Sequence, residues 1–319
     1  MPTALITGVL GQDGSLLAEL LLERGYQVVG VKRPGASIDP ELRALVARLE
    51  LVELDLAQVP LDWAAALVAR IRPDEVYHLA ACHRSSEPGQ ANDPGQQQRM
   101  VAVNHTAGLA LANALLGARH GRLVVAGSSQ MYTAALPAPA ITEQTARAPA
   151  TFYGVTKAGC LDAVAWLRRH QGLAGSCAIL FNHESARRSP AFASHKITSA
   201  AARIAGGARD RLELADLSSR VDFSSAHDIV AGLHAMALGE PDDRVLASGE
   251  LHSLEDLCQV AFSAVGLDWR AHVTSTKPPG ERPTLVGDPS RAERELGWQR
   301  TRSFATWVTE MVTADQRRL

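Results

Sequence analysis

Two hydrophobic periods alternate along the first 33 residues. An apolar run at residues 4–6 has the character of a strand, and residues 28–31 return to that character. Between them, apolar residues recur at helical spacing: Leu16, Leu17, Leu20, Leu21 and Leu22. Gly25 stands where the C-cap of this helix belongs. The pattern predicts a strand, a turn, a helix and a second strand.

The first turn is rich in glycine, with Gly8, Gly11 and Gly14 spaced three residues apart. Glycines here let the backbone approach a pyrophosphate, and the following helix N-terminus offers unpaired N–H groups and the positive end of its dipole. The segment therefore predicts the first βαβ unit of a dinucleotide-binding fold. Gln12 and Asp13, at the start of the helix, join the glycines as predicted cofactor-binding residues.

The end of the second strand indicates which dinucleotide is bound. NAD-binding units usually carry an acidic residue about 20 residues after the glycines. Here residues 31–37 contain Lys32 and Arg33, and no carboxylate occurs before Asp39. A guanidinium grips a phosphate in bidentate fashion, so we predict NADP, with Arg33 among its ligands. A solvated basic turn is the alternative interpretation.

The remaining chain continues the alternation of strands and helices. Strands are expected at residues 51–56, 75–81, 122–126, 176–181, 212–214 and 244–247. Helices are expected at residues 40–49, 60–70, 99–116, 153–170, 194–205, 228–238, 254–265, 288–297 and 304–312, and a loop at residues 85–98. This order predicts an α/β fold: a Rossmann-type doubly wound parallel sheet with a smaller C-terminal α/β lobe. We assign residues 1–182 to the NADP-binding domain, with returning segments from about 215–250, and residues 183–319 mainly to the substrate-binding lobe.

Composition narrows the class of protein. Hydrophobic residues make up 46% of the 319, and the net charge of -2 argues against a nucleic-acid partner. No apolar run reaches the ~18 residues of a membrane helix, so no membrane partner is expected. Four cysteines without metal-ligand spacing suggest reduced, packed thiols, no metal site and a cytoplasmic protein.

A tyrosine and a lysine four residues apart are the candidate catalytic pair. Tyr153 and Lys157 would lie one turn apart on one helical face, where the ammonium is expected to lower the pKa of the phenol. Ser128, at the end of the preceding strand, is placed to bind the same substrate oxygen. Together they predict proton exchange for a carbinol–ketone pair, with the hydride left to the nicotinamide.

Other site residues follow the ends of the predicted strands, where a doubly wound sheet binds its ligands. For the cofactor we assign Asp55, whose carboxylate can accept from an adenine amino group, together with Leu56, Leu79, Ala80, Ala81, Tyr153 and Lys157. For the substrate we assign Ser129, Asn182, Arg187, Arg188 and Lys196, although the three cations here could instead be solvated and Asn182 could simply cap a turn.

Several stretches resemble the extended short-chain dehydrogenases, and most closely the GDP-mannose 4,6-dehydratases. They are the glycine-rich opening and residues 73–77 (Pro-Asp-Glu-Val-Tyr), 180–185 (Leu-Phe-Asn-His-Glu-Ser), 195–198 (His-Lys-Ile-Thr) and 287–289 (Gly-Asp-Pro). The resemblance covers nearly the whole chain. It implies an NADP-dependent enzyme that acts on a nucleotide sugar, with a GDP-hexose as the expected substrate. It also implies a homodimer, and a tetramer is left open.

The chain departs from this family at three positions. The family pattern implies a glutamate at residue 130, which takes the proton from sugar C5, but here the residue is Gln130. Two arginines that would clamp the nucleotide diphosphate are replaced by Val221 and Pro278, and Arg220 and Lys277 each stand one residue earlier as substitute candidates. An alignment that is wrong by one residue there is the alternative.

Three functions remain open at this point. The favoured one is hydride transfer at sugar C4 by a ketoreductase, dehydrogenase or epimerase, because an amide cannot act as a base near pH 7. A genuine 4,6-dehydratase that uses another proton acceptor is the second. The third is a paralogue that binds NADP without turnover.

Overall fold

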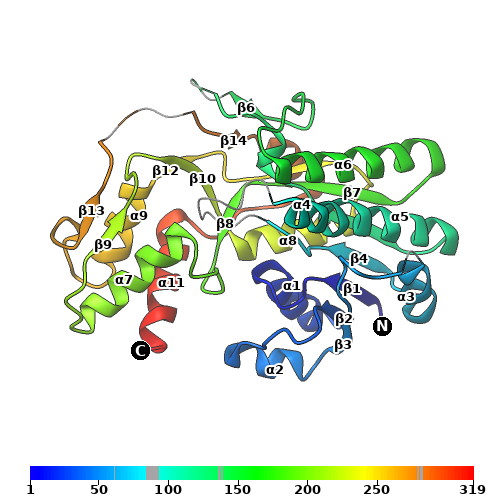
Figure 1. Ribbon diagram of the computed structural model, residues 1–319, viewed down its shortest axis with the longest axis horizontal. Helices are drawn as coiled ribbons and strands as arrows, with labels where there is room; N and C mark the ends of the chain where they lie inside the picture. Colours follow the sequence, from blue (N-terminus) through cyan, green and yellow to red (C-terminus); the bar gives the residue numbers. More distant parts are fainter. Residues whose placement is uncertain (61, 84–92, 136, 138, 279, 281–282) are drawn as a thin grey trace.

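A parallel sheet of seven strands forms the centre of the molecule, in a computed structural model that describes residues 1–60, 62–83, 93–135, 137, 139–278, 280 and 283–319 (Figure 1). The strand order is β11-β7-β5-β4-β1-β2-β3. The strands are β1 (Thr3–Thr7), β2 (Gln27–Lys32), β3 (Glu50–Glu53), β4 (Glu75–His78), β5 (Arg122–Ala126), β7 (Gly175–Leu180) and β11 (Arg244–Leu246). The order reverses beside β1, as in doubly wound folds, and the predicted fold class is confirmed.

Helices cover both faces of this sheet, which explains why inner strands such as β1 and β5 are mostly apolar and buried. One face packs against α1 (Gln12–Glu23), α2 (Arg43–Val46) and α8 (Ala226–Leu238). The other packs against α3 (Trp63–Ile71), α5 (Ala107–Ala118) and α6 (Phe152–Gln171). Figure 1 shows α5 and α6 on the opposite side of the sheet from α1 and α2.

A smaller lobe has its own apolar core, at the left of Figure 1. Its helices are α7 (Ala193–Ala205), α9 (Leu254–Ser263) and α11 (Phe304–Arg317). Two small sheets accompany them: β9 (Leu212–Leu214) with β13 (Val273–Ser275), and β8 (Asn182–Glu184) with β10 (Arg220–Ser225) and β12 (Leu251–Ser253). The strand β8 follows β7 directly, so it carries the chain from the central sheet into this lobe.

Local signals explain where several helices begin and end. Gly25 adopts φ +81° just after α1, a conformation that a residue with a side chain rarely takes. Ser253 and Asp256 form a reciprocal capping box at the start of α9. Thr151 caps α6, and Gly172, in the left-handed region, ends it. The remaining helix, α10 (Ser290–Leu296), ends at Gly297 in the same way.

The predicted loop at residues 85–98 is partly wrong. Residues 84–92 lie outside the described part, but α4 (Pro94–Val101) begins inside that range, because Asp93 caps its N-terminus and Pro94 fits its first turn. A π-helical turn (Ala102–Thr106) then joins α4 to α5. The continuous helix from Pro94 to Ala118 is long and apolar enough for a membrane span, yet half of its most apolar window is buried within the protein.

Some boundaries also differ from those expected. The strand predicted at residues 51–56 ends at Glu53, and the one predicted at residues 75–81 ends at His78, so Asp55 and Ala81 lie in the loops beyond. The last helix continues to Arg317. The sequence analysis assigned no strand to β6 (Ala140–Ile141), β14 (Val286–Gly287), β8, β10, β12 or β13.

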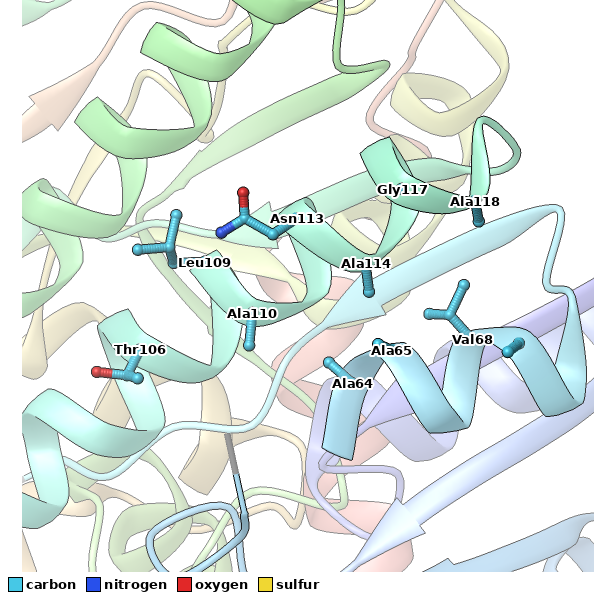
Figure 2. A pocket seen from close by; sticks show the side chains of 11 residues that line it. Ala64, Ala65, Val68, Thr106, Leu109, Ala110, Asn113, Ala114, Gly117 and Ala118 are labelled. Carbon is cyan, nitrogen blue, oxygen red and sulfur yellow. The ribbon is translucent and has the colours of Figure 1, made fainter. Parts of the chain in front are cut away.

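A shallow groove of about 570 Å³ runs between α3 and α5. Figure 2 shows that small side chains line it, among them Ala64, Ala65, Ala110 and Ala114. Because these side chains are short, the two helices pack closely over the sheet.

Candidate active site

The glycine-rich turn brings two strand ends into backbone contact. Gly8 adopts φ +75°, and a Cβ atom there would lie 2.8 Å from the Cα of Ala80. A Cβ at Gly14 would lie 2.3 Å from the carbonyl oxygen of Gly8. Side chains at these positions would therefore force the turn apart. The turn leads into the N-terminus of α1, where no side chain caps the Gly11 position, and this open, positive helix end fits a dinucleotide pyrophosphate.

The first side chains of α1 are held by the segment that follows β7. The Gln12 amide donates to the His183 carbonyl oxygen at 3.0 Å, and its own oxygen accepts from the Ser185 hydroxyl at 2.9 Å. The Asp13 carboxylate lies 2.9 Å from Nε2 of His183. These contacts span about 170 residues of sequence and fix the helix N-terminus against β8.

Asp13 and His183 form a buried ion pair. Burial alone would raise the pKa of Asp13, but the nearby His183 lowers it below its usual value. Burial would likewise lower the pKa of His183, but Asp13 raises it. The imidazole is doubly held, since Nδ1 lies 2.7 Å from the Phe181 carbonyl oxygen and can donate to it. We therefore assign the pair as carboxylate and imidazolium.

Ser128, Tyr153 and Lys157 converge at the carboxyl end of β5. Ser128 lies just beyond that strand, and the other two lie in the first turns of α6. The Lys157 ammonium donates to the Ala126 carbonyl oxygen at 2.8 Å and lies 5.9 Å from the centre of the Tyr153 ring. Burial lowers the pKa of Lys157 to about 8.

The expected lowering of the tyrosine pKa is not what the structure shows. Burial raises the pKa of Tyr153 to about 12, while hydrogen bonding with Ser128 acts in the opposite direction. The lysine does not offset burial because its ammonium is directed to the backbone of β5. In this arrangement the phenol is protonated at neutral pH, so it can act as a proton donor.

A buried asparagine in the π-helical turn supports the start of α6. Asn104 exchanges two hydrogen bonds of 2.8 Å with the backbone of Cys82 and donates to the Thr156 hydroxyl at 3.1 Å. Thr156 stands between the two predicted catalytic residues. Asn104 therefore links the loop after β4 to the catalytic helix.

Gln130 is held by the cap of α6. The Gly154 N–H donates to the Thr151 hydroxyl at 3.0 Å, and that hydroxyl donates to Oε1 of Gln130 at 3.1 Å. The Gln130 backbone N–H also donates to Ser128 Oγ at 3.2 Å. The carboxamide of Gln130 is exposed, and it offers hydrogen-bond donors and acceptors but no group that accepts a proton near neutral pH.

Two cations lie near the predicted adenosine end, and only one of them was predicted. Arg33, the predicted phosphate ligand, is exposed in the loop after β2. Arg99 of α4 lies 3.3 Å from Asp55, and both arginines lower the pKa of Cys82, which burial raises. Asp55 thus orients a cation in addition to capping Ala57. Leu56 is buried, Leu79 and Ala80 are half-buried, and Ala81 is exposed along the same edge.

The predicted substrate residues do not all meet. Ser129 is buried in the turn after Ser128, while Asn182 is exposed on β8. Lys196 and Lys277 are exposed, and the Arg220 guanidinium donates to the Leu251 carbonyl oxygen at 2.9 Å. Val221 is half-buried against the core of the lobe. Glu281, part of the motif after Pro278, lies outside the described residues.

The two arginines after β8 are engaged within the protein. Arg187 pairs with Glu19 at 2.6 Å and donates to the Ser15 hydroxyl, so it binds α1 instead of facing a diphosphate as expected. Arg188 stacks on Phe192 at 3.5 Å and pairs with Glu184 at 3.1 Å. It is close enough to Tyr153 to lower the pKa of the phenol, so it borders the predicted site.

The sequence did not predict three residues of this site: His183, Arg99, and Asn104, which supports the start of α6. His183 belongs to the Asn-His-Glu-Ser stretch that resembles the family. This resemblance was the available sign that His183 has a role in the site. Arg99 followed the segment taken as a loop. The Asp93-Pro94 pair was the available sign that a helix had begun.

Comparison with known proteins agrees with this geometry. A family model described as GDP-mannose 4,6 dehydratase matches residues 5–311. GDP-mannose 4,6 dehydratase 1 of Arabidopsis thaliana is 34% identical over 98% of this chain and 89% of its own length, and the GDP-mannose 4,6-dehydratase of Yersinia enterocolitica is 32% identical over 99% and 94%.

A solved structure shares the fold at lower identity. The dTDP-glucose 4,6-dehydratase of Bacillus anthracis, in complex with NAD, has a TM-score of 0.84 at 13% identity and covers 99% of this chain and 97% of its own. The matched fold, together with identity above 30% along nearly all of the chain, shows that this protein belongs to the GDP-mannose 4,6 dehydratase family of extended short-chain dehydrogenases, a class of NAD(P)-dependent enzymes.

Proposed function

We propose that this protein is an NADP-dependent oxidoreductase that acts at C4 of a GDP-linked or similar hexose. It would reduce a 4-keto sugar, oxidise C4 or epimerise it, rather than dehydrate the sugar. Tyr153 exchanges the proton of the C4 oxygen, Ser128 binds that oxygen, and Lys157 orients the phenol and the cofactor ribose. When bound, the nicotinamide supplies or accepts the hydride.

The presence of an amide at residue 130, next to Ser128 and the cap of α6, is the observation that carries this proposal. A carboxamide takes no proton near pH 7, so Gln130 is not a general base. Elimination across C5 and C6 needs a group that removes the C5 proton, whereas hydride transfer at C4 does not. Loss of a general base typically costs 10²–10⁴-fold in rate, roughly. The site therefore favours C4 chemistry over dehydration.

Two cations support NADP over NAD in this proposal. Arg33 and Arg99 both influence Cys82, so they share one corner of the site where a 2′-phosphate would add two negative charges. Solved structures with a similar fold carry either cofactor: RMD from Pseudomonas aeruginosa was complexed with NADPH, and the Bacillus anthracis protein with NAD.

A genuine 4,6-dehydratase is the second candidate, favoured by the extent of the similarity to such enzymes. In that case a water held by the Gln130 amide, or Tyr153 after it has given up its own proton, would remove the C5 proton. Both candidates use the same phenol and serine.

A homodimer is part of the proposal. Four large apolar side chains on two helices are exposed: Val101 on α4, and Phe152, Val155 and Trp166 on α6. Val155 and Trp166 are about half exposed, at 48% and 49%. An apolar face of this kind is typical of subunit interfaces, and light scattering of the purified chain measures the assembly.

The test compares two reactions of the same preparation. With NADPH and a GDP-4-keto-6-deoxyhexose, we expect cofactor oxidation and a sugar alcohol. With GDP-mannose, we expect little 4-keto-6-deoxy product, and Gln130→Glu should raise that product by about 10²-fold or more. Efficient dehydration of GDP-mannose by the wild type, without any NADPH consumption across 4-keto substrates, would select the dehydratase instead.

A further inference from the structure

An arginine directly after α11 joins this helix to the segment between β2 and β3. Arg318 forms hydrogen bonds with both oxygens of the Glu41 carboxylate, at 2.6 and 2.7 Å. Glu41 belongs to the helical turn Pro40–Leu42, in the same segment as the predicted phosphate ligand Arg33. Because a bidentate pair of guanidinium and carboxylate fixes direction as well as distance, the end of α11 is held against the cofactor side of the protein.

The same guanidinium holds the loop that follows β8. One of its terminal nitrogens donates to the Ala186 carbonyl oxygen at 2.8 Å, and the other donates to the Asp315 carboxylate at 3.0 Å. Ala186 directly precedes Arg187 and Arg188. Arg318 therefore connects three segments that are far apart in the sequence, and one of them is the loop that borders the predicted site.

Asp315, in the last turn of α11, is the buried member of this cluster. Its carboxylate accepts from the Thr198 hydroxyl at 2.8 Å and lies 3.9 Å from Nε2 of His195, and both of these residues belong to α7. Figure 1 shows α11 beside α7. Nδ1 of the His195 imidazole lies 2.8 Å from the Arg188 carbonyl oxygen and can donate to it. Asp315 thus lies between Arg318 and the imidazole, which bind the loop on either side of Arg187.

The backbone held in this way carries a cation to the catalytic phenol. The Arg188 guanidinium stacks on Phe192 at 3.5 Å. Burial raises the pKa of Tyr153, and Arg188 is close enough to act in the opposite direction. The contacts that Arg318 makes with the loop therefore help to set where the guanidinium of Arg188 lies relative to the phenol.

We propose that Arg318 is a positioning residue of the active site: through Ala186 and Asp315, it fixes the loop that places Arg188 beside Tyr153. Arg318 itself touches no reacting group. The inference rests on the proposed role of Tyr153 in proton exchange, but it does not depend on which reaction of the sugar follows.

Hydrogen exchange of the full chain, followed by mass spectrometry, tests the hold on the loop without any substrate. The backbone N–H groups of Arg187 and Arg188 donate to Ser185 at 3.1 and 3.0 Å, so their exchange reports opening of the loop. In Arg318→Ala, peptides that cover residues 185–192 should exchange about tenfold faster, while peptides of β1 and β5 keep their rates. Unchanged exchange of the loop would overturn the inference, whether or not the proposed reaction occurs.

A double-mutant cycle tests the connection to Arg188. The reaction measured is the one that the preparation catalyses, reduction of a 4-keto sugar or dehydration of GDP-mannose. Arg318→Ala should lower kcat about fivefold in the wild type but less than about twofold in an Arg188→Ala background, because the effect passes through that guanidinium. An equal loss in both backgrounds would mean that Arg318 has a general structural role and would overturn the proposal.

Two further variants complete the design. Glu41→Gln removes the charge that orients Arg318, so it should act in the same direction with a smaller effect, and it replaces Arg318→Ala if that variant folds poorly. Arg203→Ala is the matched control, because Arg203 of α7 pairs with Asp210 at 2.7 Å and both side chains are largely exposed. Loop exchange and kcat should stay unchanged in this control, and a change equal to that of Arg318→Ala would contradict the proposal.

Discussion

The predicted cofactor side of the site and its predicted substrate side differ in how many of their polar side chains have partners within the protein. In the first two turns of α1 the polar side chains have partners: Asp13 pairs with His183, Gln12 binds Ser185, and Glu19 binds Arg187. On the substrate side, Lys196 and Lys277 are exposed, and Arg220 reaches only a backbone carbonyl. Contacts within the protein therefore hold the predicted cofactor side in place, whereas the predicted substrate cations have few such contacts. Substitutions should have larger effects on the first side than on the second.

The largest effect is expected from the catalytic phenol. Tyr153→Phe removes the group that exchanges the proton, so kcat should fall by roughly 10²–10⁴-fold. Steady-state turnover with the best 4-keto substrate measures it. Tyr26→Phe is the control, since the Tyr26 hydroxyl donates to Glu75 at 2.8 Å, away from the site, and kcat should stay unchanged. Normal turnover by the Tyr153→Phe variant would contradict the role of Tyr153 in proton exchange.

The second-largest effect is expected from the buried ion pair between Asp13 and His183, and it concerns stability. His183→Gln leaves Asp13 without its partner and should lower the free energy of unfolding by about 3 kcal/mol, as measured by urea denaturation. His120→Gln is the matched control: His120 lies 3.5 Å from Asp74, but both side chains are largely exposed, at 39% and 47%. That pair should contribute less than about 1 kcal/mol.

The same pair predicts a pH dependence. The pKa of Asp13 is lowered from 3.8, so its stabilisation is complete above pH 3.8 and is lost as the pH falls below that value. The pKa of His183 is raised from 6.5, so its stabilisation is complete below pH 6.5 and is lost as the pH rises through the raised value. The difference between wild type and His183→Gln should be greatest between these limits. A difference that grows at alkaline pH would contradict the ion pair.

Much of the cofactor side could be predicted from sequence, because its signals are local. The glycines, the helix they begin and the Tyr153–Lys157 spacing all lie within short stretches. The Asp13–His183 contact could not be derived in this way, since it joins residues 170 positions apart. The direction in which the Lys157 ammonium points could not be predicted either, because the Ala126 carbonyl oxygen that accepts from it belongs to a different element, the strand β5.

The smaller lobe was even harder to predict from sequence, for the same reason. Its helices were expected from their periodicity, but β8, β10 and β12 are short strands whose pairing depends on distant segments. The register pairs Phe223 with Asn182 and Ser224 with His183. Without that register, sequence alone could not show that the C-terminal half of β10 lies beside Asn182 and His183.

A smaller effect is expected at the adenosine end. Arg33→Ser should reduce the preference for NADP over NAD by roughly 10- to 100-fold, because a charge-assisted hydrogen bond contributes about 1.5–3 kcal/mol. The ratio of kcat/KM for the two cofactors measures it. Lys32→Ser is the control, since Lys32 is already paired with Glu53. Equal changes in both variants would mean that only general charge matters there.

The smallest effect is expected from the exposed substrate cation. Lys277→Ala should raise the KM for the nucleotide sugar by no more than about threefold, in keeping with an exposed charge, and should leave kcat unaltered. A rise above about tenfold would show that Lys277 replaces one of the lost diphosphate arginines and would break the contrast between the two sides.

Hydride transfer to sugar C4 is the central claim, and isotope transfer tests it most directly. NADPH deuterated at the transferable position is incubated with a GDP-4-keto-6-deoxyhexose, and the sugar product is analysed by NMR and mass spectrometry. We predict deuterium at C4 of the resulting alcohol, and none in the Tyr153→Phe reaction over the same time. Undeuterated 4-keto sugar with the NADPH unconsumed, under conditions in which the same protein dehydrates GDP-mannose, would contradict the account.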